Sequence, residues 1–174
     1  VDGKSAVSAS STVSRAAGRL VATASAGPDK GRIPGKFLAG VALTEPFAGN
    51  VAVADNQTGA PISLTSAPGI GSLTASCVDQ SNAPGVEDPQ TVLTLDNATS
   101  NVINTAKRLG GAGAQVVAHA PGTVQTLTVN GSTNFEFHVQ NRDEQIIISG
   151  IVRQDGRGTG NAQCLFYGTT LRIS

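Results

Sequence analysis

The sequence predicts an all-β fold, an antiparallel β-sandwich of the jelly-roll or immunoglobulin-like type with about nine or ten strands. Gly, Thr and Val are abundant in the 174 residues, whereas charged residues make up 14% and aromatic residues 3%. Short runs of alternating apolar and polar side chains recur about every 8–12 residues, with turn-forming residues between them. No repeat of about 20–50 residues is present, which argues against a solenoid or propeller.

The first part of the chain differs in composition from the rest. Residues 1–36 are rich in Ser and Ala and carry a net charge of +4, whereas residues 37–174 carry −4. We therefore predict a basic N-terminal arm over residues 1–36 and a β-sandwich domain over residues 37–174. The arm is either a solvated spacer or a segment that docks on an anionic surface or another subunit, and Leu20–Thr23 within it suits a strand.

The first strands of the sandwich domain are predicted from alternation and turn residues. Residues 37–43 alternate with period two, and Glu45-Pro46 is expected to end this strand. Apolar residues at 51–53 and 62–64 flank the segment 55–59, which begins with Asp and ends with Gly. This arrangement predicts a β-hairpin.

The middle of the chain contains the one segment for which a helix is expected. Residues 73–77 and 92–95 are predicted strands, and the acidic segment 79–88 between them is a predicted loop. In residues 100–110, Ser100 is a suitable N-cap and apolar residues share one helical face, so at most one short helix is predicted there.

Alternation is strongest in the last third of the chain. Residues 135–139 place Phe and Val on one face and Glu136 and His138 on the other. Residues 146–152 are apolar on both faces, which predicts a central strand. The remaining predicted strands are 116–118, 127–129 and 164–173. The residues predicted to form the principal core are Phe37, Phe135, Phe137, Ile148 and Leu171.

Two cysteines, Cys77 and Cys164, lie 87 positions apart and neither belongs to a C-x-x-C motif. They form either one long-range disulfide in an exported protein or two buried thiols in a cytosolic one. Low charge and abundant Thr, Ser, Asn and Gly favour the disulfide and a secreted or cell-surface location. A zinc site made from the two cysteines and two histidines is disfavoured, because no two ligands are close in sequence.

No motif assigns catalytic residues. The two imidazoles are His138, expected on the solvent side of its strand, and His119, expected to be a partly buried structural residue. The sequence lacks a G-x-S-x-G elbow, and the glycines of 156–160 are interpreted as a hairpin loop because no helix pattern follows them. A hydrolase would require a pocket that joins one histidine to an acid and a hydroxyl. We do not expect an enzyme.

Oxygen-rich side chains suggest calcium as the most credible ion. The candidate ligands lie in one acidic loop: Asp79, Asn82, Glu87 and Asp88. Sugar binding by stacking is disfavoured, because Trp is absent and the single tyrosine, Tyr167, follows Leu165 and Phe166 and is expected to be at least partly buried.

These observations predict a non-enzymatic, exported structural or protein-interaction module with an unknown protein or cell-surface partner. The alternative is a calcium- or glycan-binding module that uses its acidic loops. A net charge of zero provides no drive toward nucleic acid, and no apolar run is long enough to predict a membrane span. A homo-oligomer is compatible with the sequence.

Overall fold

The computed structural model describes residues 6–7, 20–21, 43–67, 70–142, 144–160 and 162–173. Residues Thr44–Ile173 form one compact unit. In the other unit, β1 (Ala6–Val7) pairs in parallel with β2 (Leu20–Val21), so the start of the predicted arm strand is extended. The predicted boundary between residues 36 and 37 lies outside the described residues.

The compact unit contains two antiparallel β-sheets, as predicted. One sheet has six strands in the order β3-β12-β11-β10-β7-β8, and the other has four in the order β4-β5-β6-β9. Among the described residues there is no helix that has the length and apolar character needed to cross a membrane. The strands of the two sheets are β3 (Leu43–Ala52), β4 (Ile62–Ala67), β5 (Gly71–Asp79), β6 (Pro89–Asp96), β7 (Ile103–Leu109), β8 (Gln115–His119), β9 (Val124–Asn130), β10 (Thr133–Asn141), β11 (Glu144–Asp155) and β12 (Gln163–Ile173).

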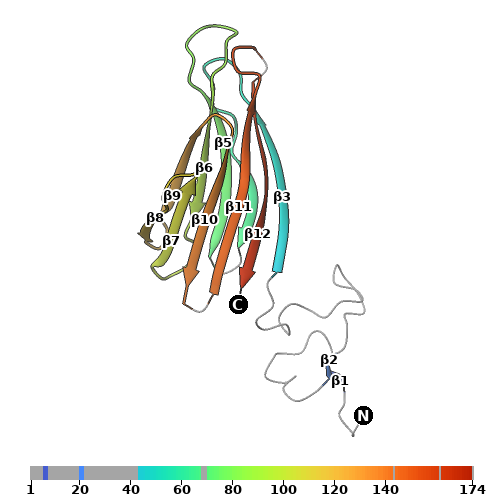
Figure 1. Ribbon diagram of the computed structural model, residues 1–174, viewed down its shortest axis with the longest axis vertical. Helices are drawn as coiled ribbons and strands as arrows, with labels where there is room; N and C mark the ends of the chain where they lie inside the picture. The colour runs from blue at the N-terminus through green and yellow to red at the C-terminus, as the bar shows by residue number, and fades with distance from the viewer. Residues whose placement is uncertain are drawn as a thin grey trace. The chain divides into compact units, whose positions relative to one another are not determined.

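A single apolar core lies between the sheets. The four-stranded sheet contributes Leu73 and Leu93, and the six-stranded sheet contributes Phe137 and Ile148, all fully buried. Alternation in each strand produces this core, because residues two apart point to the same side of a sheet. The predicted β-sandwich of nine or ten strands is thereby confirmed (Figure 1).

A disulfide joins the two sheets through this core. Cys77 of β5 and Cys164 of β12 are bonded, with their Cα atoms 5.8 Å apart, and both side chains are fully buried. The predicted pairing is confirmed. In the chain-entropy model a closed loop of this length contributes about 4–5 kcal/mol to stability.

Residues 100–110, where a helix was expected, contain the strand β7 (Ile103–Leu109) instead. Segment β7 pairs with β10 on one side and with β8 on the other. Ile103 and Thr105 face the core at alternate positions, as in a strand. The helix prediction is wrong because Val, Ile, Asn and Thr favour helices weakly, and pairing on both sides supplies the backbone partners that a helix would have supplied.

The predicted hairpin at 55–59 is also wrong, since β3 and β4 belong to different sheets. The segment pairs with β5 instead: Gly59 N–H donates to the Cys77 carbonyl and Asp79 N–H donates to the Gln57 carbonyl. Pro46 does not end a strand either. It lies inside β3, at the edge of the six-stranded sheet, where a missing backbone donor is tolerated.

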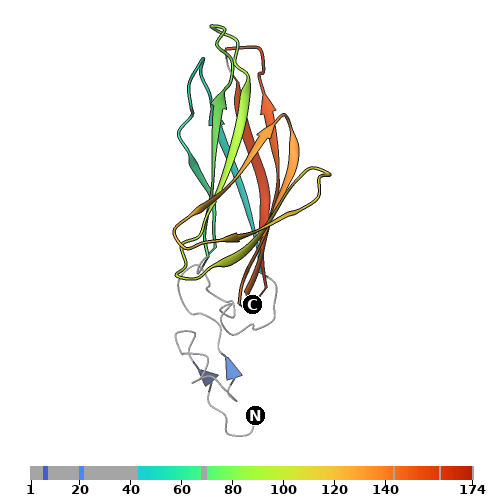
Figure 2. The same cartoon turned by 90° about the vertical axis from the view of Figure 1, so that its left-hand side faces the viewer.

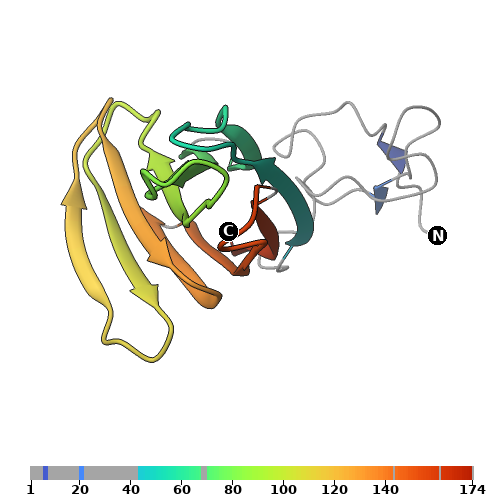
Figure 3. The same ribbon diagram turned by 90° about the horizontal axis from the view of Figure 1, so that it is seen from above.

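The loops 80–88 and 156–160 lie together at the end of the sandwich opposite Ile173 (Figures 1 and 2). Two backbone hydrogen bonds join them, from Glu87 N–H to the Thr159 carbonyl and from Gly158 N–H to the Glu87 carbonyl. Figure 3 looks onto this loop end. The segment 156–160 connects β11 to β12, which are paired, so its prediction as a hairpin loop is confirmed.

Candidate binding face

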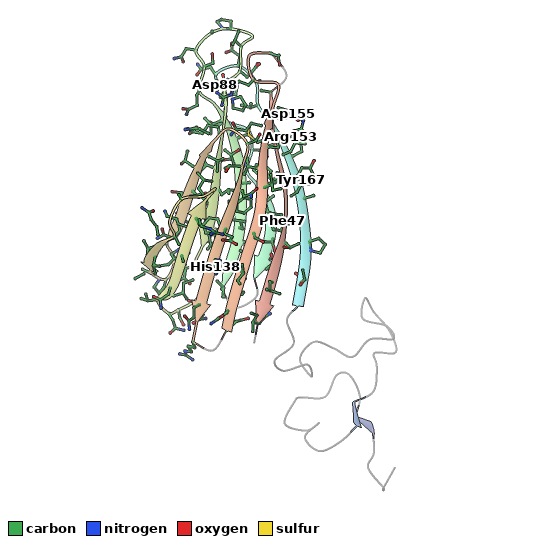
Figure 4. The ribbon with its side chains drawn as sticks, in the orientation of Figure 1. Phe47, Asp88, His138, Arg153, Asp155 and Tyr167 are labelled. Atoms are coloured by element: carbon green, nitrogen blue, oxygen red, sulfur yellow. A yellow bond between two sulfur atoms is a disulfide. The ribbon has the colours of Figure 1, made fainter. Side chains whose placement is uncertain are left out.

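The outer face of the six-stranded sheet is the surface that its strands turn away from the core. In β10, Phe135, Phe137 and Val139 are buried, so Glu136 and His138 point outward, as the alternation predicted. Figure 4 shows His138 on this sheet together with Tyr167 of β12. We call this surface the outer six-stranded face; its central residues are Arg108, Asn134, Glu136, His138, Ile147, Ser149, Ile151, Tyr167 and Thr169.

Strand β11 is apolar on both of its sides. Ile146 and Ile148 point into the core, whereas Ile147 and Ile151 point outward. The strand lies between β10 and β12, so its prediction as a central strand is confirmed. On its outward side, Ile151 is 50% exposed.

Tyr167 also points outward, next to Ile151. The two residues are direct cross-strand partners, and Tyr167 is 50% exposed. The expected burial of Tyr167 is therefore wrong. Alternation within β12 is the reason: Cys164 and Phe166 face the core, so the next residue must face the other way. This could have been predicted from the sequence: Cys164 was expected to face the core, and a residue three positions further along a strand points to the opposite side.

Charged side chains form a small cluster beside these apolar residues. Arg108 Nη2 pairs with Glu136 Oε2, and His138 Nε2 lies 3.5 Å from the same oxygen. The side chains of Arg108 and His138 are about half-exposed. Pairs at this degree of exposure contribute little to stability, so the cluster remains available for contacts with a ligand.

Two hollows lie on the outer six-stranded face. The larger has a volume of about 520 Å³ and is lined on one side by Arg108 and Glu136 and on the other by Ile151 and Tyr167. Ser149, the cross-strand partner of Glu136, also lines it. The smaller, of about 230 Å³, is lined by residues that include His138, Gln140, Gln145 and Ile147.

Two glycines form part of the larger hollow. Gly150 and Gly168 are direct cross-strand partners. A Cβ at Gly150 would lie 2.8 Å from ring carbons of Phe135, and one at Gly168 would lie 2.3 Å from the ring of Phe47. The two rings, with centroids 6.4 Å apart, therefore pack directly against the glycine backbone. Larger residues here would displace the rings and the sheet that carries the hollow.

The acidic loop uses its carboxylates mainly to hold the loop together. Asp79 is buried, and its carboxylate accepts hydrogen bonds from the backbone N–H groups of Asn56 (2.6 Å), Asp88 (2.6 Å) and Ser81 (3.0 Å). The hydrogen bond from Asp88, with the others, lowers the pKa of Asp79 against the opposing effect of burial.

The other candidate calcium ligands lie in different environments. Asp88 pairs with Arg157, and Asn82 is exposed. Glu87 is 2% exposed, and its Oε2 has no hydrogen-bond partner among the residues that the structure describes. Within the described ranges, no three acidic, histidine or cysteine side chains form a group suited to a metal ion. Calcium binding stays a prediction.

His119 belongs to a structural network. Its ring is fully buried, with Nε2 2.8 Å from the Thr123 carbonyl and Nδ1 3.3 Å from the Thr105 hydroxyl. The fully buried Asn97 donates to the His119 carbonyl, which ties together the connections at this corner. In the described part of the chain, His138 has Glu136 as a partner but no hydrogen-bonded hydroxyl, so the arrangement of a nucleophile and base is incomplete.

Comparisons with protein-family models, with curated proteins and with solved structures find no match to this chain.

Proposed function

We propose that this chain is a non-enzymatic, exported β-sandwich that acts as an interaction module through its outer six-stranded face. The observation that carries the proposal is the uncovered apolar side of β11 and β12. Ile151 and Tyr167 at its centre are each half-exposed, although an antiparallel sheet that faces only water normally places polar residues there. Exposed apolar surface next to polar groups is typical of binding sites.

The dimensions of the face suit a macromolecular partner. The adjacent strands β7, β10, β11 and β12 have 7, 9, 12 and 11 residues. At about 3.4 Å per residue and about 4.8 Å per strand, their outer side covers about 600 Å². This area is at the lower end of the range of about 600–1,000 Å² that each partner buries in a standard protein interface. The face carries half-exposed Tyr and Arg side chains. These residue types are enriched among the few residues that contribute most of the binding energy at protein interfaces.

Export is supported by the disulfide between Cys77 and Cys164, because such bonds persist in oxidising compartments. A non-enzymatic role is supported by the positions of the two histidines. His119 is enclosed in a structural network, and His138 shares an exposed carboxylate with Arg108.

Site-specific photocrosslinking tests the proposed face. A photoreactive phenylalanine analogue would replace Ile151 in the full chain, and a matched variant would carry it at Thr128, an exposed residue of the four-stranded sheet. Each variant would be incubated with intact cells of the organism that encodes the chain. We expect a discrete covalent adduct from position 151 and none from position 128. Equal adducts at both positions, or no adduct at position 151, would overturn the assignment of this face.

A further inference from the structure

We propose that the larger hollow on the outer six-stranded face binds a neutral saccharide, with Tyr167 as the ring on which the sugar stacks. This inference rests on the proposed function and names the ligand class of that face. The hollow has about 520 Å³, within the range of about 300–1,000 Å³ found for small-molecule sites.

The apolar side of the hollow matches the C–H face of a sugar ring. Tyr167 and Ile151 are cross-strand neighbours, and each is half-exposed. A tyrosine supplies a large apolar ring with a polar hydroxyl, and it loses little conformational entropy on binding because it has only two side-chain torsions. This combination suits a ligand that is apolar on its faces and polar at its edges.

The opposite side of the hollow supplies paired donors and acceptors. Arg108 offers guanidinium N–H donors, and Glu136 beside it offers carboxylate acceptors. A sugar hydroxyl both donates and accepts, so adjacent hydroxyls can each find a partner in this ion pair. Because the two charges cancel, the pair favours a neutral ligand over an acidic one.

Small polar residues connect the two sides. Glu136 is the register partner of Arg108 on β7 and of Ser149 on β11, and Ser149 is in turn the partner of Thr169 on β12. These four side chains form one row across four strands, about 14 Å long at the usual strand spacing. A row of this length with hydroxyls at one end suits an oligosaccharide chain laid across the strands.

The protein carries its own reporter for this site. Tyr167 is the single tyrosine and tryptophan is absent, so intrinsic tyrosine fluorescence comes from the hollow alone. The full chain would be titrated with neutral xylo-, cello-, manno- and N-acetylated chito-oligosaccharides, and with oligogalacturonate as an acidic comparison. We expect a saturable change in fluorescence with at least one neutral series, and weaker binding of oligogalacturonate.

Variants measured by calorimetry separate stacking from general effects. Tyr167→Ser should weaken binding of the responding sugar by about tenfold or more, whereas Tyr167→Phe keeps the ring and most of the affinity. Glu136→Gln should also weaken binding, and Thr128→Ala on the other sheet should leave it unchanged. Circular dichroism would verify that each variant is folded.

The saccharide inference is overturned if no neutral series binds, if oligogalacturonate binds more tightly, or if Tyr167→Ser leaves the affinity unchanged. These results leave the proposed face intact when crosslinking from position 151 still captures a protein. Absence of the adduct at position 151 overturns the proposed function as well.

Discussion

The outer faces of the two sheets differ sharply although both sheets share one core. On the four-stranded sheet, one row of register partners across all four strands carries only hydroxyls: Ser63, Thr74, Thr94 and Thr126. The exposed apolar residue on this face is Val124, at the start of the edge strand β9. On the six-stranded sheet, the corresponding surface carries apolar, aromatic and charged side chains, with two hollows among them.

This difference supports the proposed choice of the six-stranded face. Hydroxyl side chains are readily solvated and suit an antiparallel sheet that faces solvent. Apolar side chains in water carry a free-energy cost that only a covering partner removes. The inward residues of both sheets serve folding, and the outward residues are the basis on which we propose the six-stranded sheet as the binding face.

The largest expected effect concerns the covalent bond between the sheets. Replacing both Cys77 and Cys164 with Ala should lower the free energy of unfolding by about 4–5 kcal/mol in the chain-entropy model. Denaturant unfolding of the wild-type and double-variant chains would measure this loss. Two freely alkylated thiols in the unreduced, denatured wild-type protein would contradict the bond itself.

The next effect contrasts the two sides of β10. Phe137→Ala should destabilise the fold by about 3–5 kcal/mol, because the ring is fully buried and leaves a cavity. His138→Ala on the outward side should cost less than about 1 kcal/mol. Thermal and urea unfolding would compare the two variants. A greater loss of stability in His138→Ala than in Phe137→Ala would show that the assignment of the buried side of β10 is wrong.

Acidification should weaken the loop that the Asp79 carboxylate holds together. The lowered pKa of Asp79 means that its stabilising contribution is complete above about pH 4, the usual pKa of an unfolded aspartate, and is lost as the pH falls through the folded-state pKa. Asp79→Asn should therefore be less stable than wild type at pH 7, and this gap should narrow in acid. Unfolding measured from pH 7 to pH 2.5 tests this expectation, which a gap independent of pH would contradict.

The smallest effect on stability is expected on the outward side of β11. Ile151→Thr should change the free energy of unfolding by less than about 0.5 kcal/mol, since the side chain is half-exposed. It should nevertheless reduce binding of a hydrophobic dye to the folded chain, whereas Thr128→Ala should not. An equal loss of dye binding in both variants would remove the distinction between the two faces.

Much of the fold was predictable because alternation is a local signal. The inward side of residues 135–139 follows from the alternation alone, and Phe135 and Phe137 are buried as the pattern predicts. Ile148, which was also expected in the core, is buried as well. Leu171 was expected in the same core but is only partly buried and faces outward. Phe37, the other expected core residue, lies outside the described residues.

The candidate site was less predictable because it combines four strands. Glu136 and His138 were placed outward by the sequence, but their proximity to Arg108 required the pairing of β7 with β10. This pairing was not predicted, because a helix was expected at 100–110 and a helix cannot pair with β10. The exposure of Tyr167 was not predicted because its apolar neighbours, Leu165 and Phe166, suggested burial. Its odd spacing from Cys164, which faces the core, indicates the outward side instead.

The sequence by itself determined the all-β class and the inward sides of the best-patterned strands, and it favoured a disulfide between the two available cysteines. Only the tertiary structure decided which turns join strands of one sheet and which cross between sheets. Segment 55–59 and the turn at Asn130-Gly131 both have hairpin chemistry, yet each connects one sheet to the other. Turn residues specify a local reversal of the chain, whereas strand partners are selected by hydrogen bonds and apolar burial between segments far apart in sequence.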